Sequence, residues 1–219
     1  GSIQTAKRVQ TELSELRPGV WLNSEAYKLS TYYPPFLGTN LLFNEDFCFV
    51  FLKQFKTRRF LLYKSFSEEA NVFIRPDSGE KLFTGRLRDF LEVDSFINNF
   101  KECETSNLVL VSTPKKIAAE FRFVVSSKGE IIAHSTYKWN EIITMIPHVP
   151  PEALKKCQEV LEVGYHPDPV YIIDICADAE WNCRLLELNS FSTADLYACD
   201  KRKIASKVSE IAESEFVKH

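Results

Sequence analysis

The stretch PVYIIDICADAEWNCRLLELNS, residues 169–190, decides the fold class of this chain. Two runs of mostly apolar residues flank a polar segment around residues 178–181, a pattern that predicts a buried β-hairpin. Asp174, Glu187 and Asn189 each interrupt these otherwise apolar strands. Because residues two apart on a strand share a face, the side chains of Glu187 and Asn189 project together.

The register of this hairpin decides whether its acidic side chains meet. We expect the turn to centre on residues 179–180, which pairs Asp174 with Leu185 and places Glu187 on the diagonal. Diagonal neighbours lie about 7–8 Å apart, so both carboxylates can reach one ion. Two acids and an amide oxygen suit Mg²⁺, which prefers oxygen ligands and keeps positions for phosphate and water. The alternative is a structural network in which Arg184 or another basic side chain neutralises the buried carboxylates.

Upstream, FIRPDSGEKLFTG (73–85) places Arg75 at the end of a predicted strand, before a turn that contains Gly79 and Lys81. Arginine, lysine and the backbone N–H groups of a glycine-containing loop can all contact phosphate oxygens. The G-x-x-x-x-G-K-[ST] order of a P-loop is absent. The segment indicates a phosphate-binding loop of another kind, and the alternative is an ordinary β-turn with a surface lysine.

Glu120 and Arg122 lie two apart on another predicted strand, so their side chains face the same way. By itself such a pair is typical of a structural ion pair on a sheet face. Beside a nucleotide, Arg122 can instead stabilise charge on a transferred phosphoryl group.

The remaining pattern is of the α+β class, with strands and helices alternating along the chain. Periodicity alone does not separate strand from helix in the densely apolar residues 46–66. A hairpin is expected around Lys128-Gly129. The expected helices cover residues 4–16, 23–29, 88–101, 151–162 and about 199–217, and the other expected strands cover 71–75 and 108–111.

Composition excludes several classes of protein. Hydrophobic residues make up 45% of the 219 residues, enough for a packed core, and a net charge of −3 does not favour nucleic acid or an anionic membrane. The cysteines form no Cys-x-x-Cys pair, and no apolar run reaches the roughly 18 residues of a membrane span. We expect a soluble, cytoplasmic protein with reduced cysteines and no signal peptide. The leading Gly-Ser resembles a cloning scar, so the native N-terminus is expected to be missing.

Five segments, in this order, resemble the ATP-grasp superfamily, and most closely its clade named for one arginine and two lysines. They are FIRPDSGEKLFTG, EFRFVV, the S-x-Y of Ser135 and Tyr137, VYIIDI and ELNSFSTADLYACD. The resemblance covers residues 72–200 and implies two α+β lobes with ATP held between them. It divides the chain into a substrate-side subdomain (1–70), a small lobe (71–112) and a large lobe with the metal-binding hairpin (113–219).

The resemblance also implies roles for individual residues. Arg75 and Lys81 are expected to contact the nucleotide's phosphates. The backbone near Val111 and Ser112, on the strand that joins the lobes, is expected to bind adenine. Glu120 is placed with the nucleotide-binding residues.

Near the reaction centre, Arg122 resembles the arginine that helps to stabilise an acyl-phosphate step, and it is expected to be catalytic together with the loop lysine. Asp174, Glu187 and Asn189 resemble the Mg²⁺ triad, with Glu187 bridging two ions.

Three positions leave questions open. Relatives often have glycine where Asp195 stands and asparagine where Ser192 stands, so the substrate end of the pocket is undecided. Asp195 adds a negative charge close to the expected metal site. The second name-giving lysine is either Lys64 or Lys116.

Taken together, these patterns predict an ATP- and Mg²⁺-dependent ligase that joins a carboxylate to an amine through an acyl phosphate. The substrate is expected to be a small molecule or a peptide, with no nucleic acid or membrane partner. No protein nucleophile is needed, because positioning and charge stabilisation dominate phosphoryl transfer. The alternatives are a kinase-like phosphotransferase, a non-enzymatic ATP-binding assembly factor, and a structural domain whose acidic residues are salt-bridged.

Overall fold

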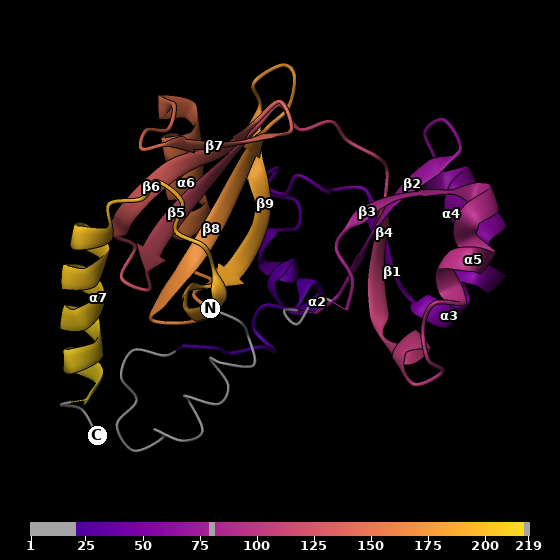
Figure 1. The fold of residues 1–219 in the computed structure, drawn as a ribbon, viewed down its shortest axis with the longest axis horizontal. Helices are drawn as coiled ribbons and strands as arrows, with labels where there is room; N and C mark the ends of the chain where they lie inside the picture. The colour runs from indigo at the N-terminus through magenta and orange to yellow at the C-terminus, as the bar shows by residue number, and fades with distance from the viewer. Residues whose placement is uncertain (1–20, 79–81, 217–219) are drawn as a thin grey trace.

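The chain folds into two lobes, each built around its own antiparallel β-sheet, as Figure 1 shows. The computed structural model describes residues 21–78 and 82–216. The helix expected over residues 4–16, and Gly79 and Lys81 of the predicted loop, lie outside these described residues.

The small lobe contains a four-stranded sheet in the order β1-β4-β2-β3. Apolar side chains from one face of this sheet pack against three short helices, which lie together on its outer side (Figure 1). The strands are β1 (Phe47–Phe51), β2 (Asn71–Pro76), β3 (Arg86–Asp89) and β4 (Leu108–Ser112), and the helices are α3 (Leu52–Thr57), α4 (Arg59–Phe66) and α5 (Val93–Ile97).

The ambiguous segment 46–66 contains both kinds of structure. Its continuously apolar start forms β1, and most of the rest forms α3 and α4. The small-lobe sheet therefore draws on residues from both sides of position 70, and the three-part division of the chain stays a prediction. The helix expected over 88–101 is wrong in extent, because its first residues pair with β2 as β3 and only Val93–Ile97 form an α-helix.

The large lobe contains a five-stranded sheet in the order β7-β6-β5-β8-β9. Alternate residues of its central strands point to opposite faces: Phe121, Phe123 and Ile173 pack against α6, whereas Val124 and Ile172 pack in the cluster that includes Ile204 of α7. The elements are β5 (Ala119–Ser126), β6 (Ile131–Trp139), β7 (Ile142–Ile146), α6 (Pro151–Glu162), β8 (Val170–Ala177), β9 (Cys183–Ser190) and α7 (Lys201–Phe216).

The expected hairpins β5–β6 and β8–β9, and the helices near 151–162 and 199–217, are confirmed. Strand β7 was not expected from the sequence. It forms the edge of the large sheet, and Ile142 and Ile143 on it are both 69% exposed, so no burial pattern marks it.

An aromatic segment fills the joint between the lobes. Tyr32, Tyr33 and Phe36 are each 1% exposed, and they belong to one apolar cluster with residues of β4, β5 and β8. Tyr32 ends α2 (Leu29–Tyr32), Phe36 ends the 3₁₀ helix Pro34–Phe36, and Tyr33 joins the two. The helix expected over 23–29 therefore begins only where it was expected to end. All three aromatic side chains therefore belong to the core.

None of the helices in the described part of the chain combines the length and the apolar character that crossing a lipid bilayer requires.

Candidate functional site

The three oxygen-bearing side chains predicted on the β8–β9 hairpin converge in the structure. Asp174 and Glu187 face each other directly across the two strands. The amide Nδ2 of Asn189 donates to Asp174 Oδ2 at 2.9 Å and to Glu187 Oε1 at 2.8 Å. Three side chains from two neighbouring strands thus meet at one point of the sheet, although their binding of a metal stays a prediction.

The register that brings these carboxylates together differs from the expected one. The expected pairing of Asp174 with Leu185 is wrong, because Leu185 pairs with Ile175 and the register shifts between Asp174 and Ile175. The shift is a β-bulge, which adds one residue to β9 and bends the strand locally. The turn also centres on residue 180, because Ala177 pairs with Cys183, and this shifts the expected register by one further residue. Together the two shifts move Glu187 from the diagonal position to the position opposite Asp174.

Arg122 of β5 binds Asp174 with two hydrogen bonds. Its Nε donates to Asp174 Oδ1 at 2.9 Å and its Nη2 to Oδ2 at 2.7 Å. The two residues are register partners on adjacent strands, and the Asp174 side chain is fully buried. Burial raises the pKa of Asp174, and the charge of Arg122 opposes that rise. Burial also acts to lower the pKa of Arg122, but the charge of Asp174 outweighs it and the net shift is upward.

Arg75 reaches the same site from the other lobe. Its Nη2 lies 2.8 Å from Glu187 Oε2, so this ion pair joins β2 of the small sheet to β9 of the large one. Burial acts to lower the pKa of Arg75, but the negative charge of Glu187 raises it overall. Arg75 and Glu187 are 112 residues apart in the sequence. The structure nevertheless places Arg75, the predicted phosphate-binding arginine, against a predicted metal ligand.

Glu120 and Arg122 do not pair with each other in the part of the chain that the structure describes. Glu120 accepts hydrogen bonds from Tyr137 Oη and from Lys138 Nζ, the latter at 2.8 Å. The guanidinium carbon of Arg122 lies 5.1 Å from the centroid of the Tyr137 ring and 5.0 Å from that of Tyr197. These aromatic neighbours, which sequence reasoning missed, fix the arginine by cation–π contact.

Arg184, the basic side chain considered as a structural partner of the carboxylates, lies elsewhere. Its Nη1 binds Asn40 and lies 3.3 Å from Glu45. The positive charge beside Asp174 and Glu187 comes instead from Arg122 and Arg75.

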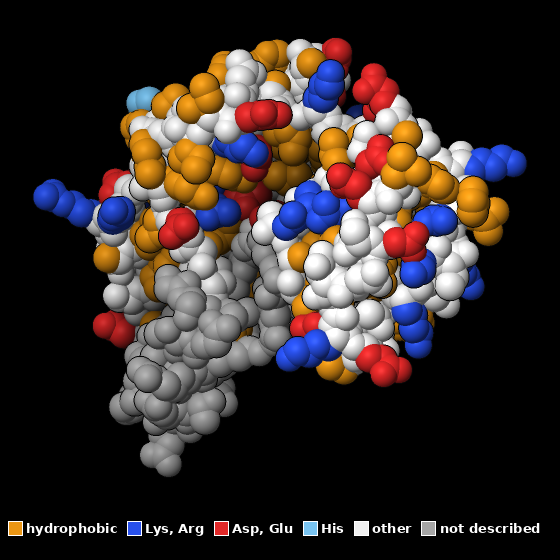
Figure 2. Space-filling model, turned by 45° about the vertical axis from the view of Figure 1, so that its right-hand side comes forward, with side chains coloured by type: hydrophobic (Ala, Val, Ile, Leu, Met, Phe, Trp, Pro, Cys, Tyr) orange, Lys and Arg blue, Asp and Glu red, His pale blue; other side chains and the backbone are white. Residues whose placement is uncertain are grey.

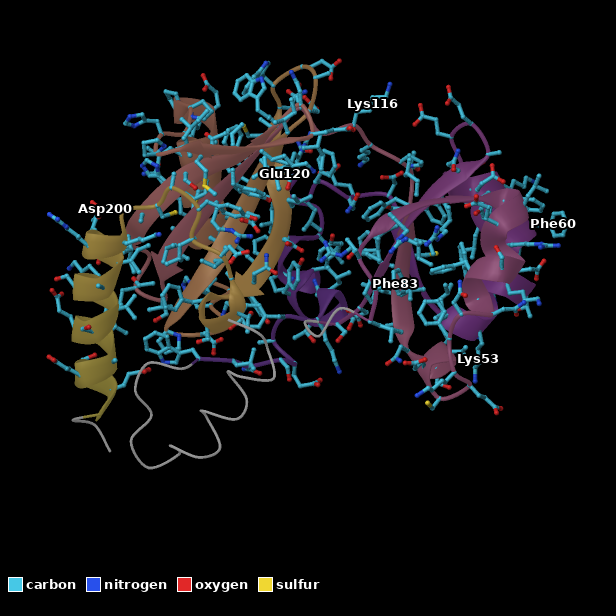
Figure 3. All side chains as sticks on the ribbon, viewed as in Figure 1. Lys53, Phe60, Phe83, Lys116, Glu120 and Asp200 are labelled. Atoms are coloured by element: carbon cyan, nitrogen blue, oxygen red, sulfur yellow. The ribbon has the colours of Figure 1, made fainter. Side chains whose placement is uncertain are left out.

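The residues predicted to bind adenine lie at the end of β4, an inner strand of the small sheet. Ser112 pairs with β1 on one side and with β2 on the other. Residues 113–117, which follow, belong to no strand and connect the two lobes. Lys116 lies on this connection and Glu120 lies in the large lobe, as labelled in Figure 3, whereas Lys64 lies on α4.

Two further aromatic residues lie close to Arg75. The hydroxyl groups of Tyr32 and Tyr33 are buried and make no hydrogen bond of ordinary geometry to the described residues. Burial raises the pKa of both phenols, and the charge of Arg75 opposes the rise. Aromatic richness was the only sequence signal for these residues, and it did not distinguish them from the rest of the core.

The donor set fits Mg²⁺ in chemistry. Asp174, Glu187 and Asn189 offer carboxylate and amide oxygens, the ligands that Mg²⁺ prefers. Each carboxylate oxygen has two lone-pair sites, so Asp174 can accept hydrogen bonds from Arg122 and still bind a cation. No group of three or more His, Cys, Asp and Glu side chains suited to a metal occurs in residues 21–78 and 82–216.

The molecular surface is hollowed between the two lobes. Figure 2 shows acidic and basic side chains gathered together inside this hollow. A surface that carries both acidic and basic side chains can bind a polyphosphate and a cation together. The basic side chains and the cation then balance the negative charge of the phosphates.

Comparison with known proteins identifies related sequences and folds. A family model matches residues 52–206, and it describes an ATP-grasp domain, family 2 of the clade named for one arginine and two lysines. No curated protein matches the chain.

Solved structures of several ATP-grasp ligases share the fold. The ATP-grasp ligase PsnB complexed with its minimal precursor is 14% identical, with a TM-score of 0.55, over 87% of this chain and 60% of that one. D-alanine–D-alanine ligase from Bacillus anthracis is 12% identical, with a TM-score of 0.60, over 96% of this chain and 75% of that one. D-alanyl-alanine synthetase A from Vibrio cholerae is 12% identical, with a TM-score of 0.59, over 89% and 65%. This chain spans 60% of the length of the PsnB chain.

Proposed function

This chain belongs to family 2 of the ATP-grasp clade named for one arginine and two lysines, and from that membership we propose that it is an ATP- and Mg²⁺-dependent ligase. The reaction joins a carboxylate to an amine. The observation that carries the proposal is the meeting of Asp174, Glu187 and Asn189 with two arginines from different lobes.

Charge balance supports a nucleotide at this point. In the structure, Arg75 compensates Glu187 and Arg122 compensates Asp174. With a magnesium–polyphosphate complex bound, Glu187 would be compensated by the cation and Arg75 by phosphate oxygens. The exchange leaves no buried charge without a partner, which would otherwise cost several kcal/mol.

The proposed reaction has two steps. A substrate carboxylate oxygen attacks the γ-phosphorus of ATP, and the bond from this phosphorus to the oxygen that bridges to the β-phosphate breaks. ADP is released, and the substrate becomes an acyl phosphate. The nitrogen of a neutral amine then attacks the acyl carbon, the carbon–oxygen bond to phosphate breaks, and the amine proton is released to solvent. Inorganic phosphate and an amide are the products.

The chain's own residues position and stabilise the reacting groups. Asp174, Glu187 and Asn189 would hold Mg²⁺, which neutralises negative charge on the phosphates. Arg75 orients the phosphates, because a guanidinium matches the geometry of phosphate oxygens. Arg122 is proposed to lie where charge develops on the transferred group, held in place by Asp174 and by two tyrosines.

Three further parts complete the proposed nucleotide site. Lys81 is proposed as a phosphate contact from the loop after β2. The end of β4 at Val111 and Ser112 leads into the connection between the lobes, where adenine is proposed to bind. Glu120 orients the Tyr137 hydroxyl beside Arg122.

The proposed substrate is a small molecule or a peptide that carries a carboxylate. PsnB was solved with a precursor peptide, and the D-alanine ligases are named for an amino acid. Both kinds of structural neighbour are ligases, which supports amide formation over transfer of phosphate to an alcohol.

An isotope-transfer assay tests this proposal. The protein is incubated with ATP, Mg²⁺ and pools of amino acids, dicarboxylic acids and short peptides whose carboxylates carry ¹⁸O. A ligase transfers one ¹⁸O from the carboxylate to inorganic phosphate at each turnover, because the carboxylate oxygen becomes the bridging atom of the acyl phosphate.

Three other results of this experiment would contradict the proposal. A phosphoester product identifies a phosphotransferase. Tight binding of ATP without turnover in any pool indicates an assembly factor. Absence of ATP binding identifies a structural domain.

A further inference from the structure

A cavity of about 390 Å³ opens in the large lobe beside the candidate site. Met145 of β7 lines one side of it, and the segment Ala194–Tyr197 lines another. Lys201, the first residue of α7, completes the lining. The volume falls in the range of roughly 300–1,000 Å³ that small-molecule sites occupy.

Residues that line this cavity contact the proposed reaction centre through a hydrogen bond and a stacked ring pair. The backbone oxygen of Asp195 accepts a hydrogen bond from Arg122 Nη1 at 2.7 Å. The Tyr197 ring stacks on Tyr137 with centroids 4.7 Å apart. The same arginine therefore holds both the predicted metal ligand Asp174 and the segment that forms the cavity.

The backbone of this segment is held in an uncommon conformation. Tyr197 has a φ of 46°, in the left-handed region that bulky side chains rarely adopt. Such conformations cost of order 1–3 kcal/mol and occur often at ligand sites, where the surrounding structure enforces them. Here the strain brings the Tyr197 ring against Arg122 and Tyr137.

Two opposite charges line the cavity. Asp195 and Lys201 are both exposed, and among the described residues neither side chain has a hydrogen-bond or ion-pair partner. Ala194, Leu196 and Met145 supply apolar lining between them. One negative and one positive group on the rim of a small cavity match a zwitterion.

Stability of the helix does not account for Lys201. A cation in the first turn of a helix opposes the helix dipole, which favours negative charge there. The first turn of α7 contains no acidic residue, and its N–H groups are capped by Asp200, which lies at the start of the helix in Figure 3. Asp200 already places a carboxylate at this helix end, so a ligand carboxylate would serve as the direct partner of the Lys201 ammonium group.

We propose that this cavity binds an α-amino acid as the amine substrate of the ligase, with Asp195 contacting its ammonium group and Lys201 its carboxylate. The proposal rests on the proposed function, since it assigns the acceptor half of that reaction. Asp195 and Lys201 are then specificity residues: they select an acceptor that carries both a free amine and a free carboxylate.

The test measures binding of amino acids without requiring turnover. Saturation-transfer NMR is recorded on the protein with Mg²⁺ and a non-hydrolysable ATP analogue, against each of the common amino acids. Every amino acid that binds is repeated as its N-acetyl and its C-amide form, each of which lacks one of the two charges.

Four variants accompany the wild type. Asp195→Asn and Lys201→Gln each remove one charge from the cavity. Glu141→Gln and Arg202→Gln are matched controls, because both residues are exposed and neither lines the cavity. Thermal unfolding verifies that all four variants fold.

The expected result is that at least one amino acid binds and that N-acetylation or C-amidation weakens its binding at least about tenfold, the loss of one charge-assisted contact. Asp195→Asn and Lys201→Gln weaken it to a similar degree, whereas the controls and the affinity for the ATP analogue are unchanged.

Binding of the analogue without binding of any amino acid overturns this inference and leaves the proposed function standing. Amino-acid binding that is unaffected by Asp195→Asn and Lys201→Gln overturns it as well. Failure of the analogue to bind overturns the proposed function itself, and the inference with it.

Discussion

The two arginine–carboxylate pairs of the site are built differently. Arg122 and Asp174 are register partners on adjacent strands of one sheet, and their side chains are 8% and 0% exposed. Arg75 and Glu187 come from the sheets of different lobes, and their side chains are 14% and 17% exposed. Strand pairing fixes the first pair, whereas the second forms only where the lobes meet.

The difference separates structure from function within one cluster of charges. A buried pair within one sheet persists whenever that sheet is folded, so it stabilises the large lobe and holds Asp174 in place. A pair that bridges two lobes can exchange partners when a ligand enters between them. We therefore expect substitutions at the first pair to change stability most, and substitutions at the second to change nucleotide chemistry most.

Asp174→Ala tests the first pair and has the largest expected effect. It leaves the buried guanidinium of Arg122 without its partner, so the free energy of unfolding should fall by about 3–5 kcal/mol. Urea unfolding followed by circular dichroism measures the change, with Glu180→Ala in the exposed turn of the same hairpin as the control. A loss below about 1 kcal/mol, the range of surface pairs, would show that this pair does not stabilise the lobe.

Glu187→Gln tests the second pair. Its amide oxygen still accepts a hydrogen bond from Arg75, so stability should change by no more than about 1 kcal/mol. Mg²⁺-dependent ATP turnover should fall by about 100-fold or more, the effect of removing one charge-stabilising group from a reaction centre. Release of ADP measures turnover, with Glu180→Gln as the matched control. Equal turnover in Glu187→Gln would remove this residue from the metal site.

Arg75→Ala measures what the bridging arginine contributes to nucleotide affinity. Loss of a hydrogen bond to a charged phosphate should weaken ATP binding by about 1.5–3 kcal/mol. Isothermal titration calorimetry gives the affinity, and Arg86→Ala, an exposed arginine on the neighbouring strand β3, is the control. If Arg75→Ala binds ATP as tightly as the wild type, Arg75 pairs with Glu187 for structural reasons alone.

Tyr137→Phe has the smallest expected effect and probes the support of Arg122. The substitution removes the hydrogen bond to Glu120 but keeps the ring beside the guanidinium. Stability should fall by about 1 kcal/mol. Thermal unfolding of Tyr137→Phe and Tyr137→Leu separates the two contributions, because only the second loses the aromatic ring. Equal losses in both would exclude a role for the cation–π contact.

Sequence reasoning located the site residues better than it located their neighbours. Polar residues inside apolar strands are conspicuous, so Asp174, Glu187 and Asn189 stood out, and their convergence follows from strand geometry. The sequence pattern did not predict which arginines pair with these carboxylates. The pairing of Arg122 with Asp174 depends on which strands are adjacent, and the approach of Arg75 depends on how the lobes meet.

Local irregularities of the strands were also not predictable from the sequence pattern. The β-bulge beside Asp174 shifts the partners of residues 171–174 by one position, and no glycine or proline marks it in the sequence. Strand β7 is exposed on both faces and lacks the alternation that reveals a strand. The prediction of a helix over 88–101 was wrong in extent because Arg88 and Asp89 pair with β2, and this tertiary contact outweighs local helical preference.

A crystal structure of the protein with Mg²⁺ and a non-hydrolysable ATP analogue tests the central claim most directly. The account predicts that Glu187 and Asn189 turn their oxygens to the cation, that Arg75 leaves Glu187 for a phosphate oxygen, and that Arg122 keeps its hydrogen bonds to Asp174. A nucleotide bound elsewhere, with the Arg75–Glu187 pair intact, would contradict it.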